Sequence, residues 1–329
     1  MRDTPLVSIL INNYNYGHFL KAAIDSALDQ TYPYTEVIVV DDGSTDNSRA
    51  VLERYGNRII PIFKANGGQG SALNAGFGRS RGKLICLLDA DDVFSAQKVA
   101  RVVETMRANP GSGWCFHRLA RCDTRTGLSL PSDPLEQPSR AIDFRADLRR
   151  AVLPSFAPAT SGLSFTRELL LQIWPMPELG GTSADRFTKF AALGLATGSF
   201  LNENLAEQKV HGYNAYTLQG TSRQWVAAKS LLHTATWLKE RFVQFIPMAD
   251  ALFGIGLGLY ERNGGVDPQY MPLVERYLQD AGPIRALAIQ GRAFYHAQEL
   301  FAPLREVRLA QFQARARQAK APLAASNAS

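Results

Sequence analysis

The sequence has few cysteines and no long hydrophobic run. Its three cysteines, Cys86, Cys115 and Cys122, cannot all pair, and their spacing matches no zinc signature. We therefore expect reduced thiols in a cytosolic protein. The longest glycine-tolerant apolar run, residues 251–260, falls well short of the ~20 residues that span a bilayer. A secreted disulfide scaffold and an integral membrane protein are both disfavoured.

No targeting segment is visible at the start of the sequence. Residues 1–5 run straight into a strand-like stretch, without the basic, apolar and cleavage regions of a signal peptide. Hydrophobic residues make up 46% of the chain and charged residues 20%, which is ordinary for a globular protein and excludes a collagen-like or disordered chain. These features together predict a cytoplasmic protein.

Positive charge is concentrated near the end of the chain. The net charge is +6, and residues 284–329 hold seven basic and two acidic side chains, so the rest is close to neutral. A uniform nucleic-acid-binding surface is therefore not expected. Residues 304–320 predict a basic helix with apolar side chains along one side. One interpretation is peripheral contact with the inner face of a membrane, and the other is a solvated helix that packs on its own domain.

Short apolar runs alternate with amphipathic segments over the first hundred residues. The expected strands cover 6–11, 36–40, 58–63 and 84–88, and the expected helices cover 19–29, 45–55 and 71–80. This alternation predicts right-handed crossovers and an α/β fold with a mostly parallel sheet flanked by helices. Sheets of this kind bind ligands at the carboxyl ends of their strands.

The remainder of the chain predicts more helix than strand. Further strands are expected at 113–122 and 161–165, and helices at 96–108, 167–173 and 183–195. From about residue 216, apolar side chains recur at helical spacing. The helices expected there cover 225–242, 252–260, 271–278 and 284–318.

Polar clusters stand where three of the expected strands end. They are residues 12–15 (NNYN), residues 41–44 (DDGS) and Asp89-Ala90-Asp91-Asp92. Three carboxylates at one strand end repel one another unless a cation lies among them. Hard oxygen ligands suit Mg²⁺ or Mn²⁺, which also bind phosphate oxygens. The alternative is a solvated turn whose aspartates cap a helix.

A glycine-rich stretch, residues 66–70 (NGGQG), allows the backbone to approach a ligand closely. It is no Walker A motif, because no Gly-Lys-Ser/Thr follows, and it lacks the G-x-G-x-x-G pattern of dinucleotide-binding proteins. A nucleotide-dependent oxidoreductase is therefore disfavoured. Nucleotidyl transfer by a metal–carboxylate site stays open as another interpretation, and a plain turn is the simplest one.

Taken together, these blocks resemble family 2 glycosyltransferases. The resemblance is carried by VSI at 7–9, YN at 14–15, QTY at 30–32, EVIVVDDGSTD at 36–46, NGGQ at 66–69, NAG at 74–76 and LDADD at 88–92. Their order and spacing match over residues 5–95, and a weaker match continues to about residue 214. The resemblance implies a GT-A (Rossmann-like) domain at 1–215, with a nucleotide-binding half at 1–95 and an acceptor half at 96–215. The helical C-terminal region at 216–329 has no counterpart.

The resemblance also implies a set of donor-binding residues. The donor is a nucleotide-diphosphate sugar, expected here to be a UDP- or dTDP-sugar. Asn12 and Tyr14 would hold the nucleoside, with Tyr14 stacked near the base. Asp42 would contact the base, and Gln69 stands where family members place a nucleotide-contacting side chain.

A divalent cation, Mn²⁺ or Mg²⁺, is implied beside the diphosphate. Asp89 would face the ribose and Asp91 would bind the metal, with Asp92 as a helper. His211 resembles a late histidine of the family that completes the metal site or touches the diphosphate. Lys209 stands where relatives often have arginine, which keeps the charge but loses the bidentate fork.

The catalytic base of the family is an acid at the start of a downstream helix, often preceded by another acid. Asp185 fits that position, although Ala184 precedes it. Such a base removes the proton from the acceptor hydroxyl as it attacks the anomeric carbon. The alternative is an acid that only stabilises a helix N-terminus. Glu178 and Glu203 are the reserve candidates, and Thr160-Ser161-Gly162 resembles a segment beside the donor sugar and acceptor.

The sequence thus predicts an inverting, metal-dependent glycosyltransferase in cell-envelope or polysaccharide biosynthesis. Its acceptor would be a saccharide or a lipid-linked molecule. A catalytically silent nucleotide-sugar binding module is the alternative, because the acid that often precedes the base is missing at Ala184.

Overall fold

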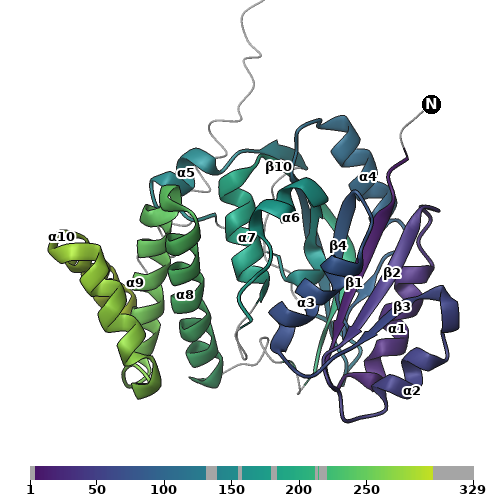
Figure 1. The fold of residues 1–329 in the computed structure, drawn as a ribbon, viewed down its shortest axis with the longest axis horizontal. Helices are drawn as coiled ribbons and strands as arrows, with labels where there is room; N and C mark the ends of the chain where they lie inside the picture. Colours follow the sequence, from purple (N-terminus) through teal and green to yellow (C-terminus); the bar gives the residue numbers. More distant parts are fainter. Residues whose placement is uncertain are drawn as a thin grey trace, which may run out of the picture.

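The structure is a computed structural model that describes residues 4–130, 139–154, 158–178, 184–211, 214 and 221–298. A central sheet carries helices on both faces, and three long helices stand side by side at one end of it (Figure 1). The basic helix expected at 304–320 lies outside the described residues.

The first half of the chain builds the parallel part of the sheet. Its elements are β1 (Val7–Asn13), α1 (Gly17–Leu28), β2 (Thr35–Asp41), α2 (Ser48–Glu53), η1 (Gly56–Arg58), β3 (Ile60–Phe63), α3 (Gly68–Arg79) and β4 (Leu84–Asp89). The strands lie in the order β3-β2-β1-β4, and all three pairings are parallel. The predicted strand–helix alternation is confirmed, and the carboxyl ends of β1, β2 and β4 meet at one edge.

Alternating side chains of β1 pack into two separate cores. Ile9 and Ile11 are fully buried in the cluster that includes α1, whereas Leu10 is buried in the cluster that includes α3. Successive side chains of a strand point to opposite faces. A strand covered by helices on both faces therefore needs a continuous apolar run.

The second half adds mixed pairings to the sheet. Its elements are β5 (Val93–Phe94), α4 (Lys98–Ala108), β6 (Trp114–Asp123), β7 (Ser129–Leu130), β8 (Arg140–Ile142), α5 (Arg145–Arg149), η2 (Thr160–Gly162), β9 (Leu163–Thr166), α6 (Arg167–Ile173), α7 (Ala184–Leu195) and β10 (Gly198–Val210). The short strand β9 runs antiparallel between β4 and β6, and β10 pairs parallel with β6. The sheet is thus parallel at one side and mixed at the other.

Three helices follow the sheet. They are α8 (Thr221–Arg241), α9 (Ile246–Arg262), reached through η3 (Val243–Phe245), and α10 (Met271–Ala297), reached through η4 (Pro268–Tyr270). As expected, two helical segments follow from residue 271, and they meet at a kink inside α10; residues 299–318 of the second expected helix lie outside the described residues. The kink lies at Gly282, whose φ is +72°, just before Pro283, which cannot donate a helical hydrogen bond.

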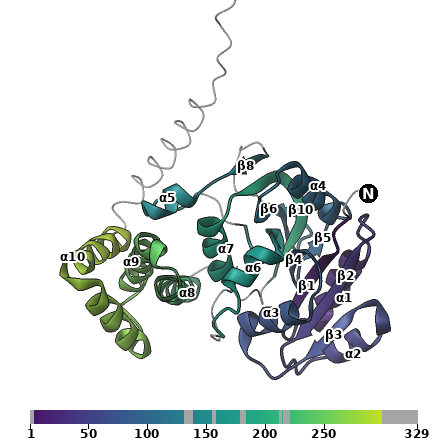
Figure 2. The ribbon, with the colours of Figure 1, turned by 45° about the horizontal axis from the view of Figure 1, so that its top comes forward.

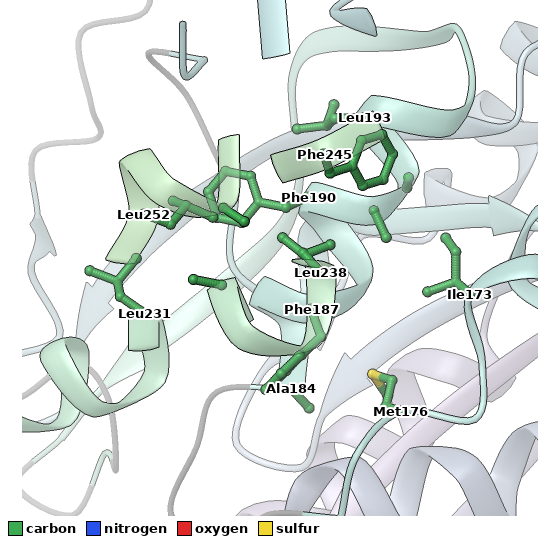
Figure 3. Packing of buried hydrophobic residues seen from close by; sticks show 14 of the residues in the cluster. Ile173, Met176, Ala184, Phe187, Phe190, Leu193, Leu231, Leu238, Phe245 and Leu252 are labelled. Carbon is green, nitrogen blue, oxygen red and sulfur yellow. The ribbon is translucent and has the colours of Figure 1, made fainter. Parts of the chain in front are cut away.

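The helical region packs on the sheet domain through α7. Phe187 and Phe190 of α7 face Leu231 and Leu238 of α8, with Phe245 beside them (Figure 3). In Figure 2, α8, α9 and α10 follow one another outward from α7, so α10 is the outermost of the three. One apolar core therefore runs from the sheet into the C-terminal helices. The domain boundary expected at residue 215 stays a prediction.

One segment, Val243–Arg262, has the length and composition of a membrane-spanning helix. Of its most apolar window, 61% is buried inside the molecule. It contains α9, which packs between α8 and α10. The core helix of a helical layer has the same composition, so this segment is weak evidence for a span.

Candidate active site

The carboxyl ends of β1 and β4 bring two predicted site residues into contact. The strand register places Asn12 opposite Asp89, and the Asn12 side chain is hydrogen-bonded to the Asp89 carboxylate. The Asn12 Oδ1 atom is buried and has no hydrogen-bond partner among the described residues. A buried acceptor without a partner, beside a carboxylate, offers an oxygen to a ligand or a cation.

Asp89, Asp91 and Asp92 form one acidic cluster. Each offers a carboxylate oxygen, and these atoms lie within 4.8 Å of one another. Burial, followed by the neighbouring charge of Asp91, raises the pKa of Asp89 to about 7. Burial and the charges of Asp91 and Asp89 also raise the pKa of Asp92 well above its usual range. The cluster therefore resists full ionisation unless a cation is added.

The donor atoms at this edge fit a divalent cation such as Mn²⁺ or Mg²⁺. Carboxylate and amide oxygens are the ligands that these ions prefer. His211 adds an imidazole, because its Nε2 lies 3.1 Å from the Asp91 Oδ2 atom. Asp89, Asp91 and His211 are therefore the residues that could hold such an ion, and the orphaned Asn12 Oδ1 lies beside them.

Asp92 has a different place in the cluster. Its Oδ2 accepts a 2.6 Å hydrogen bond from the Ser161 hydroxyl, and its Oδ1 accepts one from the Lys209 amide at 3.1 Å. Ser161 also accepts a hydrogen bond from the Asp89 amide at 3.1 Å. Asp92 and Ser161 thus fasten the end of β4 to η2 and β10, and the helper role expected of Asp92 stays a prediction.

His211 is fixed by partners that lie far apart in the sequence. Its ring stacks on Phe19 of α1, with 4.5 Å between the ring centroids. The Asn214 amide donates to Asp91 Oδ2 at 3.0 Å, and Asn214 Oδ1 accepts from the His211 amide at 2.5 Å. Asn214 was not among the predicted site residues. Its position three residues after His211 is the only signal in the sequence, and such a spacing is common without function.

Asp42, directly after β2, organises the glycine-rich stretch. Its carboxylate accepts hydrogen bonds from the amides of Gly67 (3.1 Å) and Gly68 (2.7 Å), and from Lys64 Nζ at 2.6 Å. Gly68 has a φ of +85°, which favours glycine. The glycine-rich stretch is therefore the N-terminus of α3, held by an anion. Tyr14, the residue after the end of β1, is 47% exposed.

Gln69 connects the acidic cluster with the start of α7. Its Nε2 donates to Asp89 Oδ1 at 3.0 Å and lies 3.3 Å from the Thr160 hydroxyl. Its Oε1 accepts a hydrogen bond from the Ala184 amide at 3.1 Å. The first residue of α7 is thereby tied to the acidic cluster through a single side chain.

Of the three acids considered as a base, Asp185 lies nearest the cluster in electrostatic terms. Its charge contributes to raising the pKa of Asp89. Asp185 is 8% exposed, and its Oδ2 accepts a hydrogen bond from Lys189 Nζ at 2.9 Å. Glu178 is exposed, and its carboxylate accepts a hydrogen bond from the Ser71 hydroxyl of α3 at 2.9 Å.

The third acid, Glu203, is engaged elsewhere. Its two carboxylate oxygens accept hydrogen bonds from the guanidinium group of Arg101 on α4, at 2.6 and 3.0 Å. A bidentate pair of this kind holds the carboxylate ionised and oriented toward α4. The geometry favours Asp185 over both reserve candidates.

The sequence is similar to known glycosyltransferases. The model of the family "Glycosyl transferase family 2" matches residues 8–171. An uncharacterised glycosyltransferase of Nostoc is 35% identical over 229 residues, which cover 68% of this chain and 70% of the relative. The putative teichuronic acid biosynthesis glycosyltransferase TuaG of Bacillus subtilis is 35% identical over 245 residues, which cover 73% of this chain and 89% of that protein.

Solved structures share the fold at low sequence identity. Residues 1–349 of S. aureus TarS, in complex with UDP-GlcNAc, match with a TM-score of 0.64 and 17% identity, covering 88% of this chain and 87% of that one. The mannosyltransferase PcManGT of Pyrobaculum calidifontis, in complex with GDP-Man and Mn²⁺, matches with a TM-score of 0.51 and 21% identity, covering 92% and 82%.

Proposed function

This chain belongs to glycosyl transferase family 2, and we propose that it moves a sugar from a nucleotide-diphosphate sugar to a hydroxyl acceptor with inversion at the anomeric carbon. It is a glycosyltransferase with the GT-A fold and a C-terminal helical region. The donor, the metal and the stereochemistry are the proposed part. The observation that carries the proposal is the placement of the acidic cluster and Asp185 within electrostatic reach of each other.

The proposed reaction needs two separate charges in the site. Asp185 takes the proton from the acceptor hydroxyl as the oxygen attacks the anomeric carbon. Asp89, Asp91 and His211 would hold a divalent cation on the side of the leaving group. When bound, such an ion stabilises the negative charge that develops on the leaving diphosphate.

The other residues of the edge orient the donor. Asp42 keeps the N-terminus of α3 in place, and Asn12 and Tyr14 stand at the end of β1 where a nucleoside would lie. We propose a UDP- or dTDP-sugar as the donor. The structural similarity to TarS, which was solved with UDP-GlcNAc, supports UDP, whereas the similarity to PcManGT, solved with GDP-Man, makes GDP the alternative to test.

The proposed acceptor is a cell-envelope polysaccharide precursor, either a saccharide or a lipid-linked molecule. The 35% identity to TuaG, whose name assigns it to teichuronic acid biosynthesis, supports this class. We place the enzyme in the cytoplasm. Peripheral contact with the inner face of the membrane would bring it to a lipid-linked acceptor.

The outer face of α10 supports that contact. Ile284, Leu287 and Phe294 are 85%, 71% and 60% exposed, and they lie on one side of the helix at spacings of three and seven residues. No acidic residue occurs from 281 to 298, and the remaining 31 residues hold five basic and two acidic side chains. An apolar face in a positively charged stretch suits an anionic lipid surface.

The competing proposal is a module that binds a nucleotide sugar without turning it over. The feature that favours it is Ala184, which stands where relatives often have a second acid. Both proposals require donor binding, so binding alone does not separate them. Release of nucleoside diphosphate does, because only an enzyme cleaves the bond between sugar and diphosphate.

The proposal is tested first by thermal melting with UDP, dTDP and GDP, each with and without Mn²⁺. A ligand that binds the native state raises the midpoint by mass action. We expect a rise with UDP or dTDP that requires Mn²⁺. UDP release from UDP-GlcNAc and UDP-glucose, with water or a saccharide as acceptor, then distinguishes the enzyme from the silent module. The absence of any nucleotide-dependent rise would contradict both.

A further inference from the structure

Lys189 makes a buried ion pair with the proposed base. The side chains of Lys189 and Asp185 are 6% and 11% exposed, and their charged atoms lie 2.9 Å apart, one helical turn apart on α7. Taking two charges out of water is costly, and the pair is retained only where each charge has good partners. An i, i+4 pair on a solvated helix face would contribute little, so burial sets this one apart.

A second hydrogen bond of Lys189 leads away from α7. Its Nζ donates to the Pro158 carbonyl oxygen at 2.8 Å. Pro158 stands just before η2, and Gly162 at the end of η2 is packed so tightly that an added Cβ would lie 2.8 Å from the His117 carbonyl oxygen. The carbonyl that receives Lys189 is therefore part of a firmly seated turn.

The same turn holds the acidic cluster. The Ser161 hydroxyl is bonded to Asp92 at 2.6 Å and to the Asp89 amide at 3.1 Å. The chain of contacts thus runs from Asp185 through Lys189 and the turn at Pro158–Ser161 to the carboxylates of β4. The second hydrogen bond of Lys189 therefore links α7 to the turn that holds these carboxylates.

We propose that Lys189 is a positioning residue that fixes the Asp185 carboxylate, in its ionised form, at a set distance from the acidic cluster. The proposal rests on the proposed function, in which Asp185 is the base. Lys189 and Asp89 act on the Asp185 carboxylate in opposite directions. Lys189 of its own helix favours the carboxylate form, and Asp89 of β4 disfavours it.

The test uses Lys189→Met, Lys189→Arg and the control Lys239→Met. Lys239 also pairs with an aspartate, Asp280, at 3.4 Å, but it lies on α8, outside the proposed site. UDP release from UDP-GlcNAc or UDP-glucose, whichever the wild type uses, is measured with Mn²⁺ across pH. For Lys189→Met we expect kcat to fall roughly 10- to 100-fold with KM for the donor within about threefold, because a displaced base lowers the rate without weakening donor binding.

Two further readouts separate positioning from mere stabilisation. Loss of the cation raises the pKa of the base, so the acidic limb of the kcat profile should move to higher pH in Lys189→Met. Lys189→Arg keeps the charge and should recover at least part of the rate, while Lys239→Met should keep the wild-type rate. If Lys189→Met folds poorly, the activity of Lys189→Arg alone is compared with that of the wild type. The double variant Asp185→Asn/Lys189→Met should then melt at a higher temperature than Lys189→Met, because it leaves no unpaired charge buried.

Failure of this proposal can be told from failure of the proposed function. If Asp185→Asn abolishes turnover while Lys189→Met keeps the wild-type kcat and pH profile, Lys189 does not position the base and only this inference is overturned. If Asp185→Asn keeps turnover, or the wild type releases no UDP from any donor, the proposed function fails and the role of Lys189 falls with it.

Discussion

Asp91 and His211 lie 120 residues apart in the sequence, yet the Asp91 Oδ2 and His211 Nε2 atoms are 3.1 Å apart. The two residues follow different strands of the sheet, β4 and β10. Asp91 follows β4 directly, and His211 follows β10, which reaches the same edge through its parallel pairing with β6. The contact gives the acidic cluster a nitrogen atom beside its carboxylates.

Asp91→Asn should remove metal-dependent nucleotide binding and leave the fold intact. The amide keeps the shape of the side chain but removes one anionic ligand and one source of the repulsion that raises the pKa of Asp89. We expect the rise in melting midpoint caused by Mn²⁺ plus nucleotide to fall to about 1 °C or less. The metal-free variant should melt no lower than the wild type.

The matched control for that experiment is Asp147→Asn, which changes an exposed carboxylate on α5. It should keep the wild-type response to Mn²⁺ and nucleotide. A full response in Asp91→Asn would show that the metal site has been assigned to the wrong residues.

The rise in melting temperature that Mn²⁺ causes should grow with pH. The pKa of Asp89 is raised to about 7, against about 3.9 in an unfolded chain. A carboxyl group with a raised folded-state pKa contributes stability that is complete below the unfolded value and is lost as pH rises through the folded value. The metal-free protein should therefore lose melting temperature between about pH 5 and pH 8, and Mn²⁺ should restore more of it at pH 8 than at pH 6.

Asp89→Asn provides the comparison, because an amide does not titrate. Its midpoint should vary less over the same pH range, and the Mn²⁺ response should be weak throughout. An equal Mn²⁺ response at pH 6 and pH 8 in the wild type would argue against binding to the carboxylates of this cluster.

Close packing of the helical region on the sheet domain depends on Gly194. A Cβ added there would lie 2.5 Å from the Phe245 ring. Gly194→Ala should lower the free energy of unfolding by about 1–3 kcal/mol, as overpacking of a core does. Gly78→Ala on α3 is the control, because its Cβ would meet nothing within 4 Å, and it should be neutral or stabilise by about 0.5–1 kcal/mol. Denaturant unfolding measures both, and an unchanged Gly194→Ala would refute the tight packing.

The outer face of α10 predicts binding to anionic vesicles. Changing Ile284, Leu287 and Phe294 together to serine should lower the fraction that sediments with vesicles containing phosphatidylglycerol, and wild-type binding to neutral phosphatidylcholine vesicles should be weak. Leu171→Ser, on α6, changes another side chain that is 62% exposed and should leave sedimentation unchanged. If the triple variant binds vesicles as well as the wild type does, this face does not bind the membrane. If the wild type dimerises and the triple variant does not, the face binds a second copy of the chain instead.

Much of the fold could be predicted because the local signals were strong. Continuous apolar runs ended by Asn, Asp or Gly predicted β1, β2 and β4, and one-sided apolar spacing predicted α7 and α8. The longest strand, β10, was not predicted. Its register shifts twice, between Leu201 and Asn204 and again between Asn204 and Ala206. These irregularities break the alternation of inward and outward side chains that identifies a strand from sequence.

The site was predictable where residue type and strand end coincided. Asp89, Asp91 and Asn12 fall together as expected, since parallel strands end at one edge. The Asp91–His211 contact was expected only from the family resemblance. Other contacts across long separations could not be predicted, because they depend on how β9 and β10 join the sheet. The hydrogen bond from the Ser161 hydroxyl to the Asp92 carboxylate is such a contact. The ion pair between Lys64 and Asp42 was missed for a different reason. A lone lysine before a glycine-rich stretch is usually solvated, so nothing in the sequence indicated this contact.

The proposed site consists of the acidic cluster, which would hold the cation, and the base Asp185. Its most direct test compares Asp185→Asn with Glu178→Gln. Both changes remove one acidic charge, but the Glu178 carboxylate is exposed and bonded to Ser71 on α3. Nucleotide binding is followed by melting with Mn²⁺, and turnover by UDP release. The account predicts that Asp185→Asn keeps nucleotide binding and loses turnover by at least about 100-fold, while Glu178→Gln stays within about threefold of wild type. Retained turnover in Asp185→Asn, or its loss in Glu178→Gln with binding intact, would contradict the assignment of the base.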